Sequence, residues 1–221
     1  MPPPLALDID GTITRPEGGV DERVFAPLRA WSGPVVFTTG KAFPYPIALC
    51  QFLAMPERAI AENGGVIAID GVVERAELAE RVETLAEGLA DAGIDLGWST
   101  ADLVNRWRET ELAVERSVDR DELAAVADRF GFEVVDSGYA YHVKDPAVTK
   151  GRALERACAL LGVEFEDVLA IGDSENDVAT FERAGHAVAV ANADEAAREA
   201  ADEVLDVGYA AGTLAVLERF G

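Results

Sequence analysis

The sequence predicts an α/β protein with a Rossmann-like, doubly wound parallel sheet as its core and an inserted small α+β cap domain. Short apolar segments alternate with helical patterns at both ends of the chain, as in βαβ units. In the middle, the pattern changes to helix, two strands, helix and two strands. Polar side chains follow four of the core strands. The core is therefore expected to span residues 1–73 and 147–221, and the cap residues 74–146.

The first part of the core begins with residues 5–9, which are apolar enough for a strand buried on both faces of a parallel sheet. The helical spacing of Val24, Leu28 and Trp31 predicts the next helix, and Asp70-Gly71 is a strong hairpin signal. The elements expected after the first strand are a helix over 21–31, a strand over 34–38, a helix over 46–53, a strand over 59–61, and hairpin strands over 66–69 and 72–73.

The cap is expected to begin with an amphipathic helix over residues 74–92, in which Val82, Leu85 and Leu89 recur on one side. Its other elements are strands over 102–106 and 111–116, a helix that Asp119 or Asp121 opens and that runs to 130, and strands over 132–136 and 139–143.

The core pattern then resumes after Pro146. Gly162 ends the first helix of this part in the usual C-terminal position. The expected elements are a helix over 150–161, an apolar strand over 168–172, a helix to 184, a strand over 187–190, and helices over 194–201 and 212–220.

The composition is strongly acidic, with 41 acidic and 19 basic residues and a net charge of −22. So negative a surface repels nucleic acid, which is excluded as a partner. Self-repulsion would be screened at molar salt, where the Debye length is about 3 Å. We therefore expect a halophilic protein, with an acidic mesophilic protein as the alternative.

Neither a signal peptide nor an apolar run of membrane-spanning length is recognisable in the sequence. The two cysteines, Cys50 and Cys158, lie in apolar helical patterns and are expected to be small core residues. We expect a soluble cytoplasmic protein without membrane partners, present as a monomer or a homodimer.

The end of the first strand carries two carboxylates, Asp8 and Asp10. At spacing i and i+2 they project to the same side of an extended chain, where their repulsion would raise one pKa unless a cation lay between them. Mg²⁺ prefers such oxygen ligands. The simpler alternative is a strand that runs into an Asp-Gly turn.

Polar clusters follow four predicted strands, and the carboxyl ends of parallel strands meet at one edge of the sheet. The clusters are residues 8–12, 38–41, 62–63 and 173–177. Asp173 and Asp177 would add to the negative charge beside Asp8. Their alternative role is to cap the following helix.

Lys150 follows Thr149, a suitable N-cap, and so occupies the first turn of a helix. A cation is disfavoured there, but a lysine and a helix N-terminus together can hold a phosphate. An exposed lysine is the alternative. Thr39 could donate its hydroxyl to a phosphate oxygen, while Lys41 is expected on the surface, and Asn63 serves either the site or a turn.

These motifs together resemble the haloacid-dehalogenase-like phosphatases. The matching residues are Asp8-x-Asp10-Gly-Thr12, Thr39-Gly40, Lys150-Gly151 and Gly172-Asp173-x-x-Asn176-Asp177. The insert between the second and third motifs is similar to a type-2 cap. Within that branch, the short cap and the overall length are most similar to archaeal phosphoglycolate phosphatases. Lys41 departs from the arginine or asparagine that is more usual after the glycine.

The resemblance implies that Asp8 is the nucleophile, forming an aspartyl-phosphate, and that Asp10 is the general acid and base. It implies that Mg²⁺ is held by Asp8, the backbone carbonyl of Asp10, and Asp173, with Asp177 directly or through water. The implied substrate-binding residues are Lys150, Thr39, Gly40 and Asn176, of which Asn176 would orient Lys150.

The cap would close over the site and select the leaving group. Residues that could contact a substrate carboxylate or sugar hydroxyl are Arg106, Trp107, Arg108, Arg116, Tyr139, Tyr141 and His142. Most are expected to pack or to be solvated, and His142 to be structural.

The preferred function is a Mg²⁺-dependent phosphatase for a small phosphorylated acid, with 2-phosphoglycolate first. One alternative is a phosphatase for sugar phosphates, such as sucrose or mannosylglycerate phosphates. The other is a phosphoacceptor or binding module without turnover, against which the proposed acid–base role of Asp10 argues.

Overall fold

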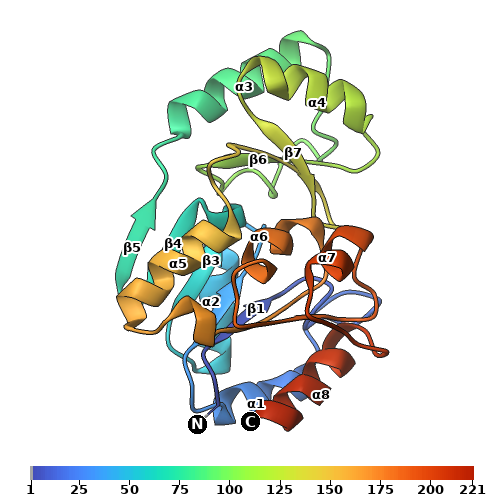
Figure 1. The fold of residues 1–221 in the computed structure, drawn as a ribbon. Coiled ribbons are helices and arrows are strands. Elements are labelled where there is room, and N and C mark those ends of the chain that lie inside the picture. The colour runs from blue at the N-terminus through green and yellow to red at the C-terminus, as the bar shows by residue number, and fades with distance from the viewer. Residues whose placement is uncertain (1) are drawn as a thin grey trace.

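The structure is a computed structural model that describes residues 2–221 (Figure 1). It contains an eight-stranded sheet and a separate three-stranded sheet, and the predicted α/β class is confirmed. The strands of the large sheet are β1 (Leu5–Asp8), β2 (Val35–Thr38), β3 (Arg58–Ala61), β4 (Val66–Ile69), β5 (Val72–Arg75), β9 (Leu169–Gly172), β10 (His186–Ala189) and β11 (Glu203–Val204).

The large sheet places β1 at its centre, in the order β11-β10-β9-β1-β2-β3-β4-β5. The strands from β11 to β3 are parallel, and β4 and β5 continue the sheet as an antiparallel hairpin. Leu5 pairs with Val35 on one side and with Leu169 on the other. The ends of β1, β2, β3 and β9 therefore lie at the same edge, although residues 5 and 169 are far apart in the sequence.

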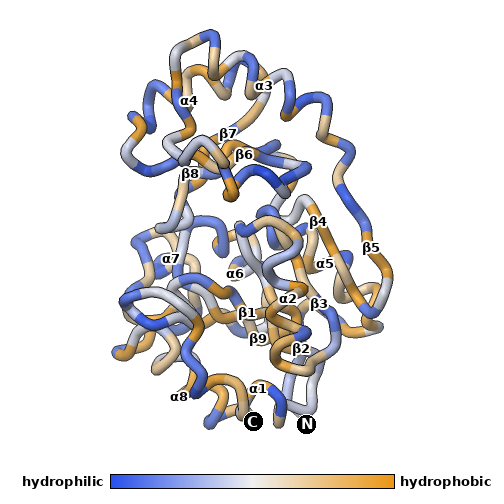
Figure 2. Tube along the Cα trace, turned by 180° about the vertical axis from the view of Figure 1, so that it is seen from behind, coloured by the Kyte–Doolittle hydropathy of each residue, from blue (hydrophilic) through white to orange (hydrophobic). Residues whose placement is uncertain are grey.

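Helices cover both faces of this sheet, as the doubly wound prediction requires. The side chains of Leu5 and Leu7 pack on one face and that of Ala6 on the other, and Figure 2 shows these central strands as a hydrophobic band. One face is covered by α1 (Phe25–Ala30), α2 (Pro44–Leu53) and α8 (Tyr209–Phe220), and the other by α5 (Lys150–Leu161), α6 (Val178–Phe181) and α7 (Glu195–Ala200).

The small sheet forms the cap, above the core in Figure 1. Its antiparallel strands, in the order β6-β8-β7, are β6 (Glu111–Val114), β7 (Glu133–Asp136) and β8 (Tyr141–Lys144), and its helices are α3 (Ala79–Asp91) and α4 (Arg120–Arg129). Leu112, Val114 and Val143 pack against these helices. Because side chains alternate along a strand, Glu111 and His142 lie on the opposite face, which is the face toward the core.

Two expectations for the secondary structure are wrong, and one strand is missing from them. Residues 102–106 form turns and no strand, because the side chain of Asp102 accepts a hydrogen bond from the Asn105 backbone N–H at 2.9 Å and so competes with strand pairing. The first cap helix begins at Ala79, since β5 continues the hairpin to Arg75. Strand β11 was not expected. The predicted domain boundaries (1–73, 74–146 and 147–221) stay a prediction.

Two further findings concern the composition. Cys50 and Cys158 are buried free thiols, as expected. Within residues 2–221, no helix combines the length and the apolar character that crossing a bilayer requires.

Candidate active site

The turn that follows β1 brings Asp8 and Asp10 to the carboxyl edge of the sheet. Asp8 ends the strand and is only 4% exposed, whereas Asp10 lies in the turn and is partly exposed. Gly11 has φ +78°, and a Cβ atom at this position would lie 1.9 Å from Asp173 Oδ2. The Asp-Gly turn therefore exists, and it also allows a second acidic side chain to approach the strand end.

Three carboxylates meet at this point. Asp8, Asp173 and Asp177 are buried, and each offers an oxygen within 4.8 Å of the others. Asp177 Oδ2 accepts hydrogen bonds from the backbone N–H groups of Asp173 at 3.0 Å and Ser174 at 3.3 Å. Asp177 thus takes part in the capping box of the 3-10 helix η4 (Glu175–Asp177) and also belongs to the acidic cluster. The two roles that the sequence left open for this residue, helix cap and cluster member, are therefore combined.

Lys150 supplies the positive charge of the cluster. It is the first residue of α5, behind the Thr149 cap, and its side chain is fully buried. Its Nζ donates to Asp8 Oδ1 at 2.6 Å, Asp177 Oδ1 at 2.7 Å and Asn176 Oδ1 at 3.0 Å. All three protons of the ammonium group are engaged, so Lys150 is not an exposed lysine.

The electrostatics of the cluster favour a further cation. Burial raises the pKa of Asp8 to about 7, although Lys150 opposes this shift. Burial, together with the charges of Asp8 and Asp177, raises the pKa of Asp173 to about 9. Burial alone would lower the pKa of Lys150, but Asp177 and Asp8 hold it above its usual value. One ammonium leaves three carboxylates under-compensated, and oxygen ligands of this kind fit a hard divalent cation.

Thr39 and Gly40, at the end of β2, form the opposite wall. Thr39 is buried, and its Oγ1 accepts a hydrogen bond from the Lys41 backbone N–H at 3.0 Å. A Cβ atom on Gly40 would lie 2.7 Å from Cε1 of His142, so this glycine permits the cap to approach. The cavity between the two domains is lined by Asp8, Asp10, Thr39, Gly40, Lys41, Ser137, Tyr139, His142 and Asn176.

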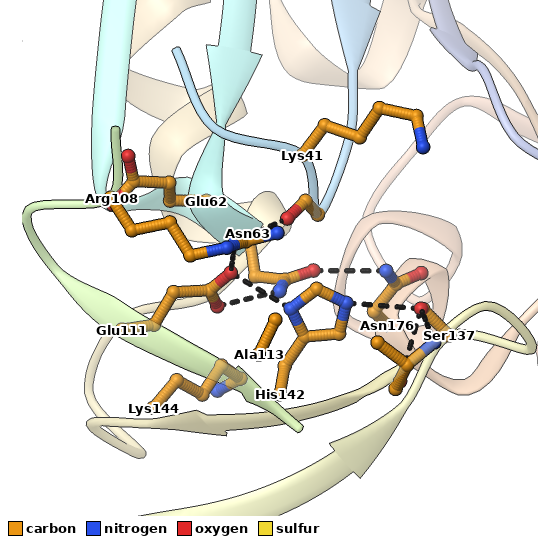
Figure 3. Close-up of polar contacts among 12 residues, drawn as sticks. Lys41, Glu62, Asn63, Arg108, Glu111, Ala113, Ser137, His142, Lys144 and Asn176 are labelled. Carbon is orange, nitrogen blue, oxygen red and sulfur yellow. Dashed lines mark hydrogen bonds and ion pairs between the residues drawn. The ribbon is translucent and has the colours of Figure 1, made fainter. Parts of the chain in front are cut away.

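The cap face of the cavity is organised by Glu111 (Figure 3). This buried carboxylate accepts hydrogen bonds from His142 Nδ1 at 2.8 Å and from Arg108. Burial would raise the pKa of Glu111, but His142 and Arg108 hold it below its usual value. The other ring nitrogen of His142 lies 3.0 Å from Ser137 Oγ, at the cavity wall.

Asparagine side chains connect the two domains. Asn176 Nδ2 donates to Asn63 Oδ1 at 2.9 Å, and Asn63 Nδ2 donates to Glu111 Oε2 at 2.7 Å. Arg108 Nη1 also donates to the Gly40 carbonyl at 2.7 Å. Asn63 has φ +53°, a conformation that asparagine tolerates, so it serves the turn and the site together.

All the residues predicted for the site meet here: Asp8, Asp10, Thr39, Gly40, Lys150, Asn176, Asp173 and Asp177. Sequence reasoning missed Lys41 as a cavity residue and Glu111 as a partner of the core. For Lys41, its position directly after Thr39-Gly40 was an available signal. For Glu111 there was none, because its partner Asn63 lies 48 residues away.

Comparison with known proteins agrees with this geometry. Residues 123–217 match the family model described as haloacid dehalogenase-like hydrolase. A protein of Natronomonas pharaonis named phosphoglycolate phosphatase is 53% identical over 221 residues, covering 99% of this chain and 98% of that protein. A Halorubrum lacusprofundi protein with the same name is 54% identical over 219 residues, covering 98% and 96%.

The fold is shared with solved structures as well. A crystal structure of a Thermoplasma acidophilum protein superposes with a TM-score of 0.85 at 24% identity, covering 100% of this chain and 98% of that one. The predicted resemblance is confirmed, and the chain belongs to the haloacid dehalogenase-like hydrolases.

Proposed function

We propose that the protein is a Mg²⁺-dependent phosphomonoester hydrolase that converts 2-phosphoglycolate to glycolate and phosphate. The observation that carries the proposal is the contact of Lys150 Nζ with Asp8 Oδ1 at 2.6 Å, in a buried cluster with Asp173 and Asp177. Both relatives described above are named phosphoglycolate phosphatase. The cavity is narrow, because residues of the core and of the cap line it together, and a confined site suits a small ester better than a polymer.

In the first step, the carboxylate of Asp8 attacks the phosphorus atom, and the bond from phosphorus to the ester oxygen breaks. Asp10 gives its proton to the departing oxygen, so that glycolate leaves as a neutral alcohol at that position. The product on the enzyme is an aspartyl-phosphate at residue 8. Lys150 orients Asp8 and offers positive charge to the phosphoryl oxygens.

In the second step, Asp10 removes a proton from a water molecule that attacks the aspartyl-phosphate. Cleavage of this intermediate releases phosphate and restores the carboxylate of Asp8. Thr39 and the Gly40 backbone line the side of the cavity where the phosphoryl oxygens would lie, and Asn176 holds Lys150 in place.

Asp8, the backbone carbonyl of Asp10, Asp173 and Asp177 would hold Mg²⁺, with Asp177 directly or through water. When bound there, the ion supplies the charge that lets an anionic nucleophile approach an anionic ester. Both oxygens of Asp177 already accept hydrogen bonds, which favours a water-mediated contact for this residue.

A phosphate-release assay against a panel of phosphomonoesters, with Mg²⁺ at low and at molar KCl, tests the proposal. We expect 2-phosphoglycolate to be hydrolysed in preference to sugar phosphates. Asp8→Asn should reduce turnover by at least ~10³-fold because it removes the nucleophile. The matched control is Asp128→Asn on the exposed face of α4, which should retain full activity.

Two outcomes would contradict the proposal. If the protein hydrolysed a sugar phosphate in preference to 2-phosphoglycolate, the proposed substrate would be wrong. A phosphoenzyme that forms at Asp8 and persists without releasing phosphate would instead identify a phosphoacceptor module.

A further inference from the structure

Lysine is used in an unusual way in this chain. Only three lysines occur, and the other basic residues are arginines. The side chains of Lys41, Lys144 and Lys150 are 24%, 5% and 0% exposed. No lysine therefore serves as an ordinary solvated surface residue, and each one calls for a specific explanation.

Two of the three are fully explained by their partners. Lys150 gives its three ammonium protons to Asp8, Asp177 and the amide oxygen of Asn176. Lys144 lies in the cap, where its Nζ donates to Glu133 and to the carbonyl oxygens of Asp145 and Val148. Neither ammonium group has a free donor for another ligand.

Lys41 is different. Within residues 2–221, the polar contact of its Nζ is a single ion pair with Asp10 Oδ2 at 3.2 Å. The ammonium lies 4.1 Å from the centroid of the Tyr139 ring, which closes one side of the cavity from the cap. Figure 3 shows the side chain extending away from Glu111 and His142. Since an ammonium group has three protons, Lys41 can still donate to another anion.

The position of this spare charge matters for the leaving group. Asp10 is the residue proposed to protonate the ester oxygen, and Lys41 touches Asp10. In 2-phosphoglycolate, a single carbon separates the ester oxygen from the carboxylate. The carboxylate would therefore lie beside Asp10, and once Asp10 has given its proton to the departing oxygen the two negative charges repel each other. A lysine between them offsets this repulsion. A leaving group that is a neutral alcohol carries no such charge and gains nothing from the lysine.

We propose that Lys41 is a specificity-determining residue that binds the carboxylate of the leaving group, with the Tyr139 ring holding its ammonium in place. This inference rests on the proposed function and deepens it. Lys41 selects phosphate esters of short hydroxy acids over esters of neutral alcohols. Lys41 would thus separate 2-phosphoglycolate from esters of neutral sugars, such as sucrose phosphate.

The test compares two esters that differ only in the group Lys41 would contact: 2-phosphoglycolate, and 2-hydroxyethyl phosphate, in which an alcohol replaces the carboxylate. We expect Lys41→Met to lower kcat for both esters, because Asp10 loses its partner. The KM should rise at least ~10-fold for 2-phosphoglycolate and much less for 2-hydroxyethyl phosphate. In Lys41→Arg, which keeps the positive charge, the KM for 2-phosphoglycolate should stay close to that of the wild-type protein. Arg29→Met, on the exposed face of α1, is the control for loss of one positive charge.

A binding measurement makes the result independent of turnover. Calorimetric titration of 2-phosphoglycolate into Asp8→Asn and into Asp8→Asn/Lys41→Met should give affinities that differ at least ~10-fold, whereas 2-hydroxyethyl phosphate should bind both variants about equally. Equal losses for the two esters, or equal affinities in the titration, would overturn the role of Lys41.

Failure of the proposed function would look different. If the wild-type protein prefers another acidic ester, such as 3-phosphoglycerate over glycerol 3-phosphate, only the identity of the substrate changes, and loss of that preference in Lys41→Met still supports the inference. If the wild-type protein shows no preference for acidic over neutral esters, the inference is wrong.

Discussion

Asn63 of the core donates a hydrogen bond from Nδ2 to Oε2 of Glu111 in the cap at 2.7 Å, and both side chains are buried. On its other side, Asn63 accepts from Asn176, which in turn accepts from Lys150. A continuous line of buried polar groups thus runs from the cap sheet to the lysine of the acid cluster, and Figure 3 shows the part of it from Glu111 through Asn63 to Asn176. The position of the cap on the core and the orientation of Lys150 are therefore linked through two asparagines.

Replacing the cap partner should break this link. Glu111→Gln leaves the side chain of Arg108, which is only 2% exposed, without its counter-charge. Leaving one member of a buried ion pair unmatched costs about 3–5 kcal/mol. We expect a loss of this size in urea unfolding, together with a lower kcat. Glu115→Gln, at an exposed position just beyond β6, is the control, and an equal loss in both variants would contradict the link.

Gly11 and Gly71 offer a matched pair for testing the crowding around Asp173. Both have positive φ, +78° and +90°, so alanine should cost about 1 kcal/mol of stability at either position. Only at Gly11 would the added Cβ meet the Asp173 carboxylate. Because displacement of a site group by about 1 Å can cost ~10²-fold in rate, Gly11→Ala should nearly abolish phosphate release, whereas Gly71→Ala should leave it unchanged. Similar rates for the two variants would refute the placement of Asp173.

These contacts also show what the sequence can and cannot predict. Asp8, Lys150 and Asp173 were found because each follows a predicted strand or opens a predicted helix, and the parallel topology then brings them together. The role of Glu111 depends on how the cap packs against the core, and no local sequence pattern predicts this packing. Asp102 was assigned to a strand because its side-chain hydrogen bond to the Asn105 backbone is invisible to hydrophobic periodicity.

The raised pKa values of Asp8 (about 7) and Asp173 (about 9) predict how the metal-free protein responds to pH. The usual carboxyl pKa of 3.8 applies in the unfolded chain, so between pH 4 and 9 the folded state binds more protons than the unfolded state. The free energy of unfolding should therefore fall as pH rises through this window, by at most about 1.4 kcal/mol per pH unit for each group.

Mg²⁺ should reverse this trend, because it binds the deprotonated carboxylates. The increase in Tm on adding Mg²⁺ to EDTA-treated protein should grow from pH 5 to pH 9. Asp173→Asn should flatten the pH dependence of the metal-free protein. A Mg²⁺ effect that is the same at every pH would argue against binding at these residues.

The acidic surface predicts a specific dependence on salt. Glu83, Glu87 and Asp91 lie on the exposed side of α3 at i, i+4 spacing, where like charges destabilise a helix. Glu87→Lys should therefore raise Tm in 0.1 M KCl and have much less effect in 3 M KCl, where the charges are screened. An equal gain at both salt concentrations would show that screening is not the cause.

The central place of β1 in the sheet affects the order in which the site is assembled during synthesis. Asp8 is made among the first residues, yet its partners Lys150 and Asp173 come from the last third of the chain, after the entire cap. During synthesis on the ribosome, Asp8, the proposed nucleophile, has no ammonium partner until α5 is made and β9 inserts beside β1. A truncated chain that ends before residue 150 would thus carry Asp8 but could not assemble the cluster with Lys150 and Asp173.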